Sequence, residues 1–207
     1  MVSMPSSPTE SRPYHHGDLR SALLATAERT LRVKGPTALS LRELAREIGV
    51  SHAAPGRHFK DKQSLLDALA LTGFDRLAEA LESADDPALP LEPRLTTLAR
   101  AYLGFALDNA ALLELMYARK HAPATPDVAH RMAAAIDRTV GALERLIADG
   151  QRRGEIVEGE PARLTLFLGS TLHGYASFAA NEMLTPEAVL AGVADLVHHT
   201  LHGLIRH

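Results

Sequence analysis

Apolar residues recur three or four positions apart along almost the whole chain, and this spacing limits the fold more than any other feature. It places apolar side chains on one face of an α-helix, whereas the alternating pattern of a half-buried strand does not stand out. Glycine and proline breaks divide the pattern into segments of helix length. The spacing predicts an all-α protein of about nine helices.

Capping residues mark where the first helices start and stop. The predicted N-caps are Asp18, Ser40 and Ser51, and Glu43 stands where it would complete a capping box with the second of them. Gly35 and Pro36 end the first helix, and Gly49 ends the second. A longer helix is predicted to follow residue 61.

The clearest break is DDPALPLEP, residues 85–93. Helices are predicted over 95–107, 111–119 and 132–147, and from Pro161 and Pro186 onward, with a further break at GQRRGEIVEGEP. We divide the chain into a disordered polar arm at 1–17, a three-helix helix-turn-helix domain at 18–70, and a larger helical domain at 71–207.

Composition excludes several classes of protein. The chain of 207 residues is 46% apolar, 23% charged and only 4% aromatic, so aliphatic side chains are expected to fill its core. It contains no cysteine, which excludes disulfides and thiolate metal sites. No apolar run approaches the ~18 residues of a membrane span, and the arm lacks the apolar centre of a secretory signal. We therefore expect a cytoplasmic protein.

Charge is distributed unevenly along the chain. Residues 12–70 contain ten Lys and Arg against six Asp and Glu, whereas residues 71–207 contain twelve against eighteen. A basic first third on an acidic body indicates that one end meets a polyanion, and chance fluctuation is the alternative.

The basic third also contains a helix-turn-helix pattern. Gly49 suits a left-handed turn, and Val50 is expected to fill the space between the two helices. The stretch RHFKDK then adds Arg57, His58, Lys60 and Lys62. Cations bind DNA phosphates, and the first residues of the second helix read base edges, so the pattern favours DNA binding. Alternatively, Arg42, Arg46 and Lys60 form a solvated surface, and His58 and Phe59 only pack the small domain, which is the preferred interpretation for Phe59.

Residues 18–70 strongly resemble the DNA-binding domain of the TetR family of bacterial transcriptional regulators. The resemblance is carried by LLATAERTLRVKGPTALSLRELAREIGVSHAAPGRHFKDKQSLLDAL. GQRRGEI followed by two apolar helices is similar to the family's regulatory domain. The resemblance implies a homodimer that binds a near-palindromic operator, most often as a repressor, and that is released, or occasionally made to bind, when a small molecule occupies the second domain. A helical ligand-binding protein without DNA function is the alternative.

The resemblance also implies which residues contact DNA. Arg42 matches a position that often reaches a base, and the start of the recognition helix matches residues that read base edges. The predicted DNA-binding residues are Ser40, Arg42, Ser51, His52, Ala53, Ala54, Arg57, His58 and Lys62. Gly56 departs from the family, which usually has tyrosine there. We expect a floppier recognition helix and weaker operator binding than in a Gly56→Tyr variant.

Two apolar helices near the chain end are expected to form a four-helix interface with the partner copy, and a monomer core is the alternative. The predicted interface residues are Leu164, Phe167, Leu168, Thr171, Val193, Leu196, Val197 and Leu201. Aromatic, Met and His side chains favour a pocket for an apolar small molecule, although each could be plain core. The predicted ligand-binding residues are Tyr102, Phe105, Met116, Tyr117, His121, His173, Tyr175 and Phe178, with His173 the best polar candidate.

Catalytic and metal functions find little support in the sequence. There is no Gly-rich phosphate loop, nucleophile elbow or convincing catalytic triad, so we expect no enzyme activity and no cofactor. His198 and His202 stand four residues apart, a spacing that can chelate zinc, but no acidic pair accompanies them. We predict no metal site.

Overall fold

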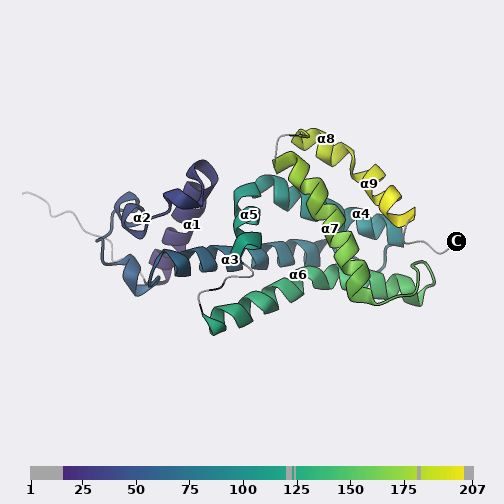
Figure 1. The fold of residues 1–207 in the computed structure, drawn as a ribbon, viewed down its shortest axis with the longest axis horizontal. Helices are drawn as coiled ribbons and strands as arrows, with labels where there is room; N and C mark the ends of the chain where they lie inside the picture. Colours follow the sequence, from purple (N-terminus) through teal and green to yellow (C-terminus); the bar gives the residue numbers. More distant parts are fainter. Residues whose placement is uncertain (1–15, 120–122, 124, 181–182, 203–207) are drawn as a thin grey trace, which may run out of the picture.

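The computed structural model describes residues 16–119, 123, 125–180 and 183–202 of the chain. Over these residues it contains nine α-helices, two short 3-10 helices and no strand (Figure 1). The predicted all-α class and the number of helices are therefore confirmed. None of these helices is long and apolar enough to cross a membrane. The predicted arm at 1–17 falls almost wholly outside the described residues.

The helices at the basic end come first along the chain. They are α1 (His16–Lys34), α2 (Leu41–Glu47) and α3 (Lys62–Ala84), with short 3-10 helices η1 (Pro36–Ala38) and η2 (Pro55–Arg57) between them. The helix α1 ends at Gly35, whose φ of 74° only glycine adopts readily. The predicted cap at Asp18 is wrong, because α1 begins two residues earlier and residue 18 lies within the helix.

Six helices form the rest of the described chain. They are α4 (Leu91–Asp108), α5 (Ala110–Arg119), α6 (Pro126–Arg152), α7 (Pro161–Ala180), α8 (Pro186–Ala191) and α9 (Val193–His202). The long helices α3 and α6 lie side by side, and α7 packs against α6 (Figure 1). The predicted domain boundary at residues 70–71 lies inside α3, and the division into two domains stays a prediction.

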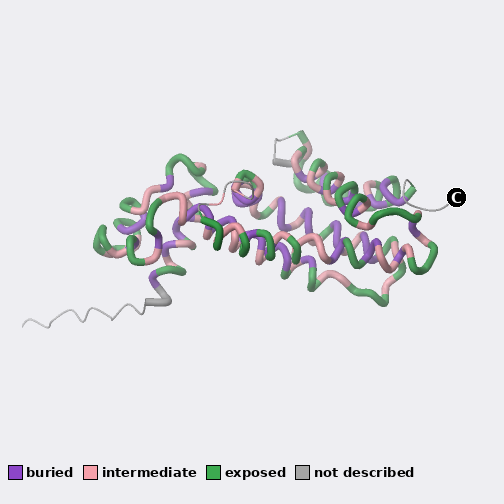
Figure 2. Tube along the Cα trace, turned by 60° about the horizontal axis from the view of Figure 1, so that its bottom comes forward, coloured by how far each residue is buried: buried purple, intermediate pink, exposed green. Residues whose placement is uncertain are grey.

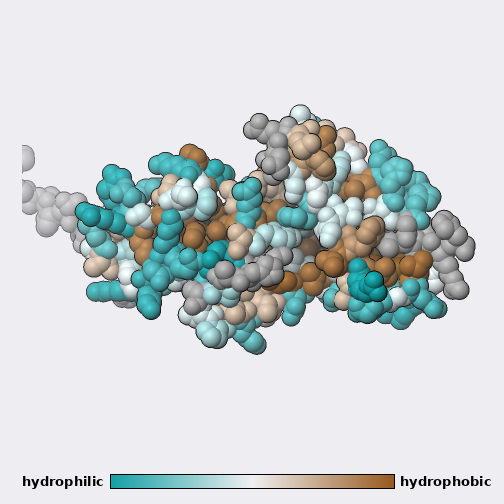
Figure 3. Space-filling view, viewed as in Figure 1, coloured by the Kyte–Doolittle hydropathy of each residue, from teal (hydrophilic) through white to brown (hydrophobic). Residues whose placement is uncertain are grey.

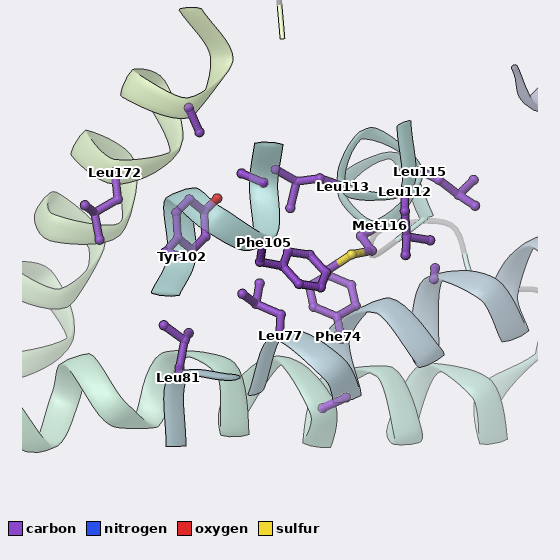
Figure 4. Close-up of a cluster of buried hydrophobic side chains, with 14 of the residues drawn as sticks. Phe74, Leu77, Leu81, Tyr102, Phe105, Leu112, Leu113, Leu115, Met116 and Leu172 are labelled. Atoms are coloured by element: carbon purple, nitrogen blue, oxygen red, sulfur yellow. The ribbon is translucent and has the colours of Figure 1, made fainter. Parts of the chain in front are cut away.

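One continuous apolar core runs through both ends of the molecule. Buried positions recur along α3 and α6, as the helical spacing of apolar residues requires (Figure 2). In the larger part, Phe74, Leu77, Phe105 and Met116 meet between α3, α4 and α5 (Figure 4). A side chain at Gly73 would overlap Met116, so glycine at this position permits the close packing of α3 on α5.

Two predicted boundaries in the second half are wrong. The single helix expected from Pro186 onward is broken at Gly192, the C-cap of α8, whose N–H still donates to the carbonyl of Ala188 at 3.0 Å. The hydroxyl of Tyr175 occupies the space that a side chain at Gly192 would need. The helix α6 continues past Gly150, the start of the predicted break, and ends at Arg152. The chain then turns back, so that Ile156 packs against Gly150.

Candidate functional site

The turn between α2 and the next segment has the predicted form. Gly49 has φ 74°, and Val50 is half-buried against the core while its N–H donates to Ala45 at 3.0 Å. The predicted capping box is wrong. Ser40 holds the N-cap position but its side chain makes no capping hydrogen bond, and Glu43 pairs instead with Arg46 on the solvent side of α2. Charge pairing three residues along a helix has replaced the cap.

The third helix of the motif differs most from the sequence-based expectation. Ser51 does not cap an α-helix. Residues 51–54 form a turn with the Ala54 N–H donating to Ser51 at 3.0 Å, and η2 follows as a single 3-10 turn. Proline at 55 has no N–H to donate to residue 51, and glycine at 56 is a poor helix former, so nothing stabilises an α-helix here. The N–H groups of His58 and Phe59 both donate to Pro55 at 2.9 Å.

The segment around η2 presents most of the predicted DNA-binding residues to solvent. Exposed residues are Ser51, His52, Ala53, Arg57 and, on α2, Arg42, whereas Ser40, Ala54, His58 and Lys62 are half-buried. Hydrophilic side chains dominate this end of the molecule (Figure 3). The arrangement brings the nine predicted residues to one end of the fold, and their contacts with DNA stay a prediction.

The segment around η2 is held to the core by Phe59 and His58. Phe59 is buried in the core, as predicted, and the guanidinium of Arg20 on α1 stands over its ring at 5.4 Å from the centroid. His58 is half-buried, and its Nε2 is shielded from solvent without a hydrogen-bond partner among the described residues. The ring of His58 is therefore partly packed in the small domain, while its Nε2 has no hydrogen-bond partner among the described residues.

The start of α3 is fixed by its own capping box. Asp61 accepts a hydrogen bond from the Ser64 N–H at 2.8 Å, while Ser64 Oγ accepts one from the Asp61 N–H at 3.1 Å. The backbone hydrogen bond from Ser64 lowers the pKa of Asp61 below its usual range. The Lys62 ammonium donates to the carbonyl of Thr37 at 2.9 Å, a contact that joins α3 to η1 and that the sequence did not indicate.

A second candidate site lies between α6 and α7. A cavity of about 530 Å³, which we call the α6–α7 cavity, is closed on the inner side by α3 and α5. Its lining includes Phe74, Tyr117, Ile136, Val140, Leu166 and His173, with Thr139, Thr165, Ser170 and Glu144 as polar members. Hydrophobic side chains gather where α7 crosses α6 (Figure 3). This size and lining are typical of small-molecule sites.

Three of the predicted ligand residues form one polar group, of which Tyr117 and His173 line the cavity and Tyr102 lies behind them. Tyr102 Oη lies 2.8 Å from His173 Nδ1, and the Tyr117 ring stacks on the His173 ring with centroids 4.1 Å apart. Burial raises the pKa of Tyr102, and the neighbouring Tyr117 hydroxyl adds to the effect, so Tyr102 stays protonated. The same two stacked rings also line a cavity of about 260 Å³ between α5 and α7, which we call the α5–α7 cavity.

The other predicted ligand residues lie elsewhere. Phe105 and Met116 are buried in the core, Phe178 is exposed, and Tyr175 packs against Gly192 on the side of α7 that faces α9. His121 lies outside the described residues. The cavity residues missing from the sequence prediction are mostly on α6 and at the start of α7, where Thr139 and Thr165 look like ordinary helix residues. They can be recognised as cavity residues only in the folded structure, where they lie close to Phe74, Tyr117 and His173.

The predicted dimer residues fall into two groups. Leu168, Val193, Val197 and Leu201 are buried within this chain's own core, whereas Phe167 is 47% exposed. Leu164, Thr171 and Leu196 are half-buried. The apolar faces of α7 and α9 are therefore largely used inside the chain, and Phe167 is the one member of the predicted set that the described residues leave exposed.

An ion-paired bridge connects α1 with the α4–α5 junction. Arg76 on α3 donates to Glu28 Oε1 on α1 and to Asn109 Oδ1, both at 2.7 Å. The helix α5 also packs directly on α1. The helix that carries Tyr117 is therefore in direct contact with α1.

The paired histidines of α9 do not make a complete metal site by themselves. His198 Nε2 and His202 Nε2 lie 2.7 Å apart, but the described residues contain no group of three or more His, Asp or Glu arranged to hold a metal ion.

Comparison with known proteins relates both parts of the chain to one family. Residues 23–69 match the model for bacterial regulatory proteins of the tetR family, and residues 95–204 match the tetracyclin repressor-like C-terminal domain. The chain belongs to the TetR family of transcriptional regulators. The resemblance of residues 18–70 to this family is confirmed.

Relatives of this TetR-family chain support the assignment. HTH-type transcriptional regulators of Mycobacterium tuberculosis and Mycobacterium bovis are 31% identical over 144 residues, covering 67% of this chain and 59% of theirs. The chain thus spans less than two thirds of the length of these curated relatives. A protein of unknown function from Rhodococcus sp. RHA1 is 44% identical, with TM-score 0.82 over 95% of this chain and 100% of that one. A tetR-family regulatory protein from the same organism, 23% identical with TM-score 0.74 over 88% and 96%, shares the fold.

Proposed function

We propose that this TetR-family chain binds a near-palindromic DNA operator as a homodimer, represses transcription there, and is released by a small molecule in its larger helical part. The observation that carries the proposal is the exposed segment from Ser51 to Arg57, held at the basic end by the Gly49 turn and buried Phe59. No catalytic role is proposed.

DNA affinity in this proposal comes from cations and specificity from the short exposed side chains. Arg42 and Arg57 are exposed and available to phosphates or base edges. His52 and Ala53 project from the turn before η2, where a histidine can donate to a base and an alanine methyl can contact thymine. This segment is a short 3-10 turn. In the major groove it would therefore either lengthen into a helix or contact only a few bases.

Dimerisation is needed because one molecule has a single helix-turn-helix. A two-fold axis would present two such motifs to two half-sites. The exposed Phe167 on α7 and the groove beside it, bordered by Tyr175, Asp195 and His199, support an interface on the α7–α9 side. The partner would cover these residues in the dimer.

Release by a small molecule would use the path from the cavities to α1. Tyr117 on α5 borders the α6–α7 cavity, α5 packs on α1, and Arg76 ties α1 to the end of α4. A molecule that displaces Tyr117 would therefore disturb the helix that supports the DNA-binding segment.

A footprint of the purified protein on DNA flanking its own gene, taken at several salt concentrations, tests the proposal. We expect a protected inverted repeat whose log affinity falls linearly with log salt, because bound cations displace counterions. Absence of protection at low salt, both for this protein and for Gly56→Tyr, would instead favour a ligand-binding protein without DNA function.

A further inference from the structure

The α6–α7 cavity has a charge character that restricts what it can hold. Among its described lining residues there is no lysine or arginine, and the single charged member is Glu144, which is exposed at the rim. The α6 arginines on either side of Glu144 in the sequence are already used. Arg138 pairs with Glu82 at 2.9 Å, and Arg145 pairs with Asp85 at 3.1 Å.

An anion would find no compensating charge in this cavity. Moving a carboxylate, sulfonate or phosphate out of water is strongly unfavourable unless a cation or several donors replace its hydration. The surrounding part of the chain, residues 71–207, also has an excess of six acidic residues over basic ones. The charge of the cavity lining and the net charge of residues 71–207 therefore both disfavour anionic ligands.

One buried hydroxyl in the lining is without a partner. Thr165 on α7 is 5% exposed, and its Oγ1 makes no hydrogen bond with the residues that the structure describes. Other helical threonines donate to the carbonyl four residues back: Thr30, Thr72, Thr96, Thr139, Thr171 and Thr200. Because buried polar groups are nearly always paired, this hydroxyl marks a place for a polar atom of a ligand.

The α7 wall leaves space for that ligand. Gly169 lies one turn beyond Thr165 on the lining, and a Cβ built there would contact nothing within 4 Å. Phe74, Ile136, Val140 and Leu166 supply apolar surface around it. The combination is a largely apolar chamber with one buried hydroxyl that has no partner among the described residues.

We infer that the α6–α7 cavity binds an uncharged, largely apolar molecule that forms a hydrogen bond with Thr165 Oγ1, and that it discriminates against anions. This inference rests on the proposed function only in taking the bound molecule to be the effector. Binding itself is a property of the cavity and is measured without DNA, so a failed footprint would leave the inference intact.

Two fluorescent probes that differ only by a sulfonate test it. N-phenyl-1-naphthylamine is uncharged, and 1-anilinonaphthalene-8-sulfonate is its anionic counterpart. We expect the uncharged probe to bind the full chain at least about tenfold more tightly. Gly169→Trp, which fills the chamber, should abolish this binding, whereas Gly169→Ala, which adds only a methyl group, should retain it.

Thr165→Val tests the hydrogen bond at nearly constant side-chain size, and we expect severalfold weaker binding of N-phenyl-1-naphthylamine. Unchanged affinity in this variant would overturn the assigned role of Thr165. Sulfonate binding as tight as that of the uncharged probe, and sensitive to Gly169→Trp, would overturn the charge selectivity.

Two further outcomes would overturn the site itself. If Gly169→Trp keeps the helical circular dichroism and full probe affinity, the probe binds elsewhere. If Gly169→Trp alters the molecular mass in solution while Gly169→Ala does not, the cavity is an interface between copies of the chain rather than a ligand site.

Discussion

Tyr102 Oη lies 2.8 Å from His173 Nδ1, so a buried phenol on α4 fixes the ring that separates the α6–α7 and α5–α7 cavities. The contact connects residues 71 positions apart and holds the imidazole in place for its stacking on Tyr117. Both rings therefore depend on a hydroxyl that is not itself part of either cavity wall.

Tyr102→Phe removes this hydroxyl and is expected to lower the free energy of unfolding by about 1 kcal/mol, because His173 loses a buried partner. Urea unfolding followed by circular dichroism measures the change. Tyr175→Phe is the control, since it removes the hydroxyl of a tyrosine on α7 that packs against Gly192 and not against His173. Equal losses in the two variants would show that the Tyr102–His173 contact contributes nothing.

Thr165→Val is expected to stabilise the ligand-free protein by about 1 kcal/mol, because it removes a buried hydroxyl that has no partner among the described residues. Thr200→Val should instead destabilise by about 1 kcal/mol, since the hydroxyl of Thr200 is also buried but donates to Leu196 at 2.6 Å. Thermal unfolding of both variants compares the two directly. The same sign of change in both would contradict the prediction.

Arg94→Met tests a buried ion-pair cluster. Arg94 is 2% exposed and donates to Asp85 and Asp149, both at 2.7 Å. Burial alone would lower the pKa of Arg94, but the hydrogen bonds with these carboxylates more than offset it and raise the pKa. We expect a loss of about 3 kcal/mol at neutral pH, because two carboxylates lose a buried partner.

Acid should reduce the difference between Arg94→Met and the original protein. The hydrogen bond from Arg94 lowers the pKa of Asp149, so this pairing stabilises the fold above the usual carboxyl pKa of 3.8 and is lost as pH falls through the lowered value. Unfolding at pH 7 and near pH 3 measures the change. Arg152→Met, which removes only an exposed partner of Asp149, should cost less than about 1 kcal/mol.

Gly56→Tyr is expected to bind the operator more tightly, by about fivefold to tenfold. Gly56 is exposed, and a Cβ there would meet nothing within 4 Å, so the ring can be accommodated on the DNA-facing side. Gly56→Ala separates helix stabilisation from any contact that the tyrosine side chain makes with DNA. Operator titration of the three proteins gives the result, and equal or weaker binding by Gly56→Tyr would refute the idea.

Arg57→Gln should weaken binding to all DNA sequences alike and reduce the slope of log affinity against log salt by about 1, as expected for a phosphate contact. Arg131→Gln, a change of an exposed arginine on α6 far along the chain, is the control and should leave the slope unchanged. Loss of discrimination between operator and random DNA in Arg57→Gln would instead assign Arg57 to base recognition.

The sequence predicted those features that a single residue type decides locally. Gly49 adopts the left-handed turn, the long helix α3 follows residue 61, and Phe59 enters the core. It did not predict that η2 would replace an α-helix. Pro55 and Gly56 destabilise an α-helix there, but they do not indicate which backbone conformation forms in its place.

Contacts between helices explain most of the remaining differences between the sequence-based predictions and the structure. Val193 and Val197 show an apolar helix face, but periodicity cannot tell burial inside one chain from burial between two chains. The break at Gly192 depends on the position of Tyr175, which is on another helix. Thr165 has no distinguishing neighbours along the chain, and only the packing of the helices leaves its hydroxyl without a partner among the described residues.

The uninterrupted helix α3 has a mechanical consequence. Its 23 residues span about 34 Å, from the capping box beside the DNA-facing segment to the core next to α6. A tilt of about 5° pivoting at the far end of α3 would carry the capped end through about 3 Å, close to the rise along the DNA axis of about 3.4 Å between adjacent phosphates of one strand. A small tilt of α3 is thus large enough at Lys62 to shift the exposed segment from Ser51 to Arg57 out of register with a duplex.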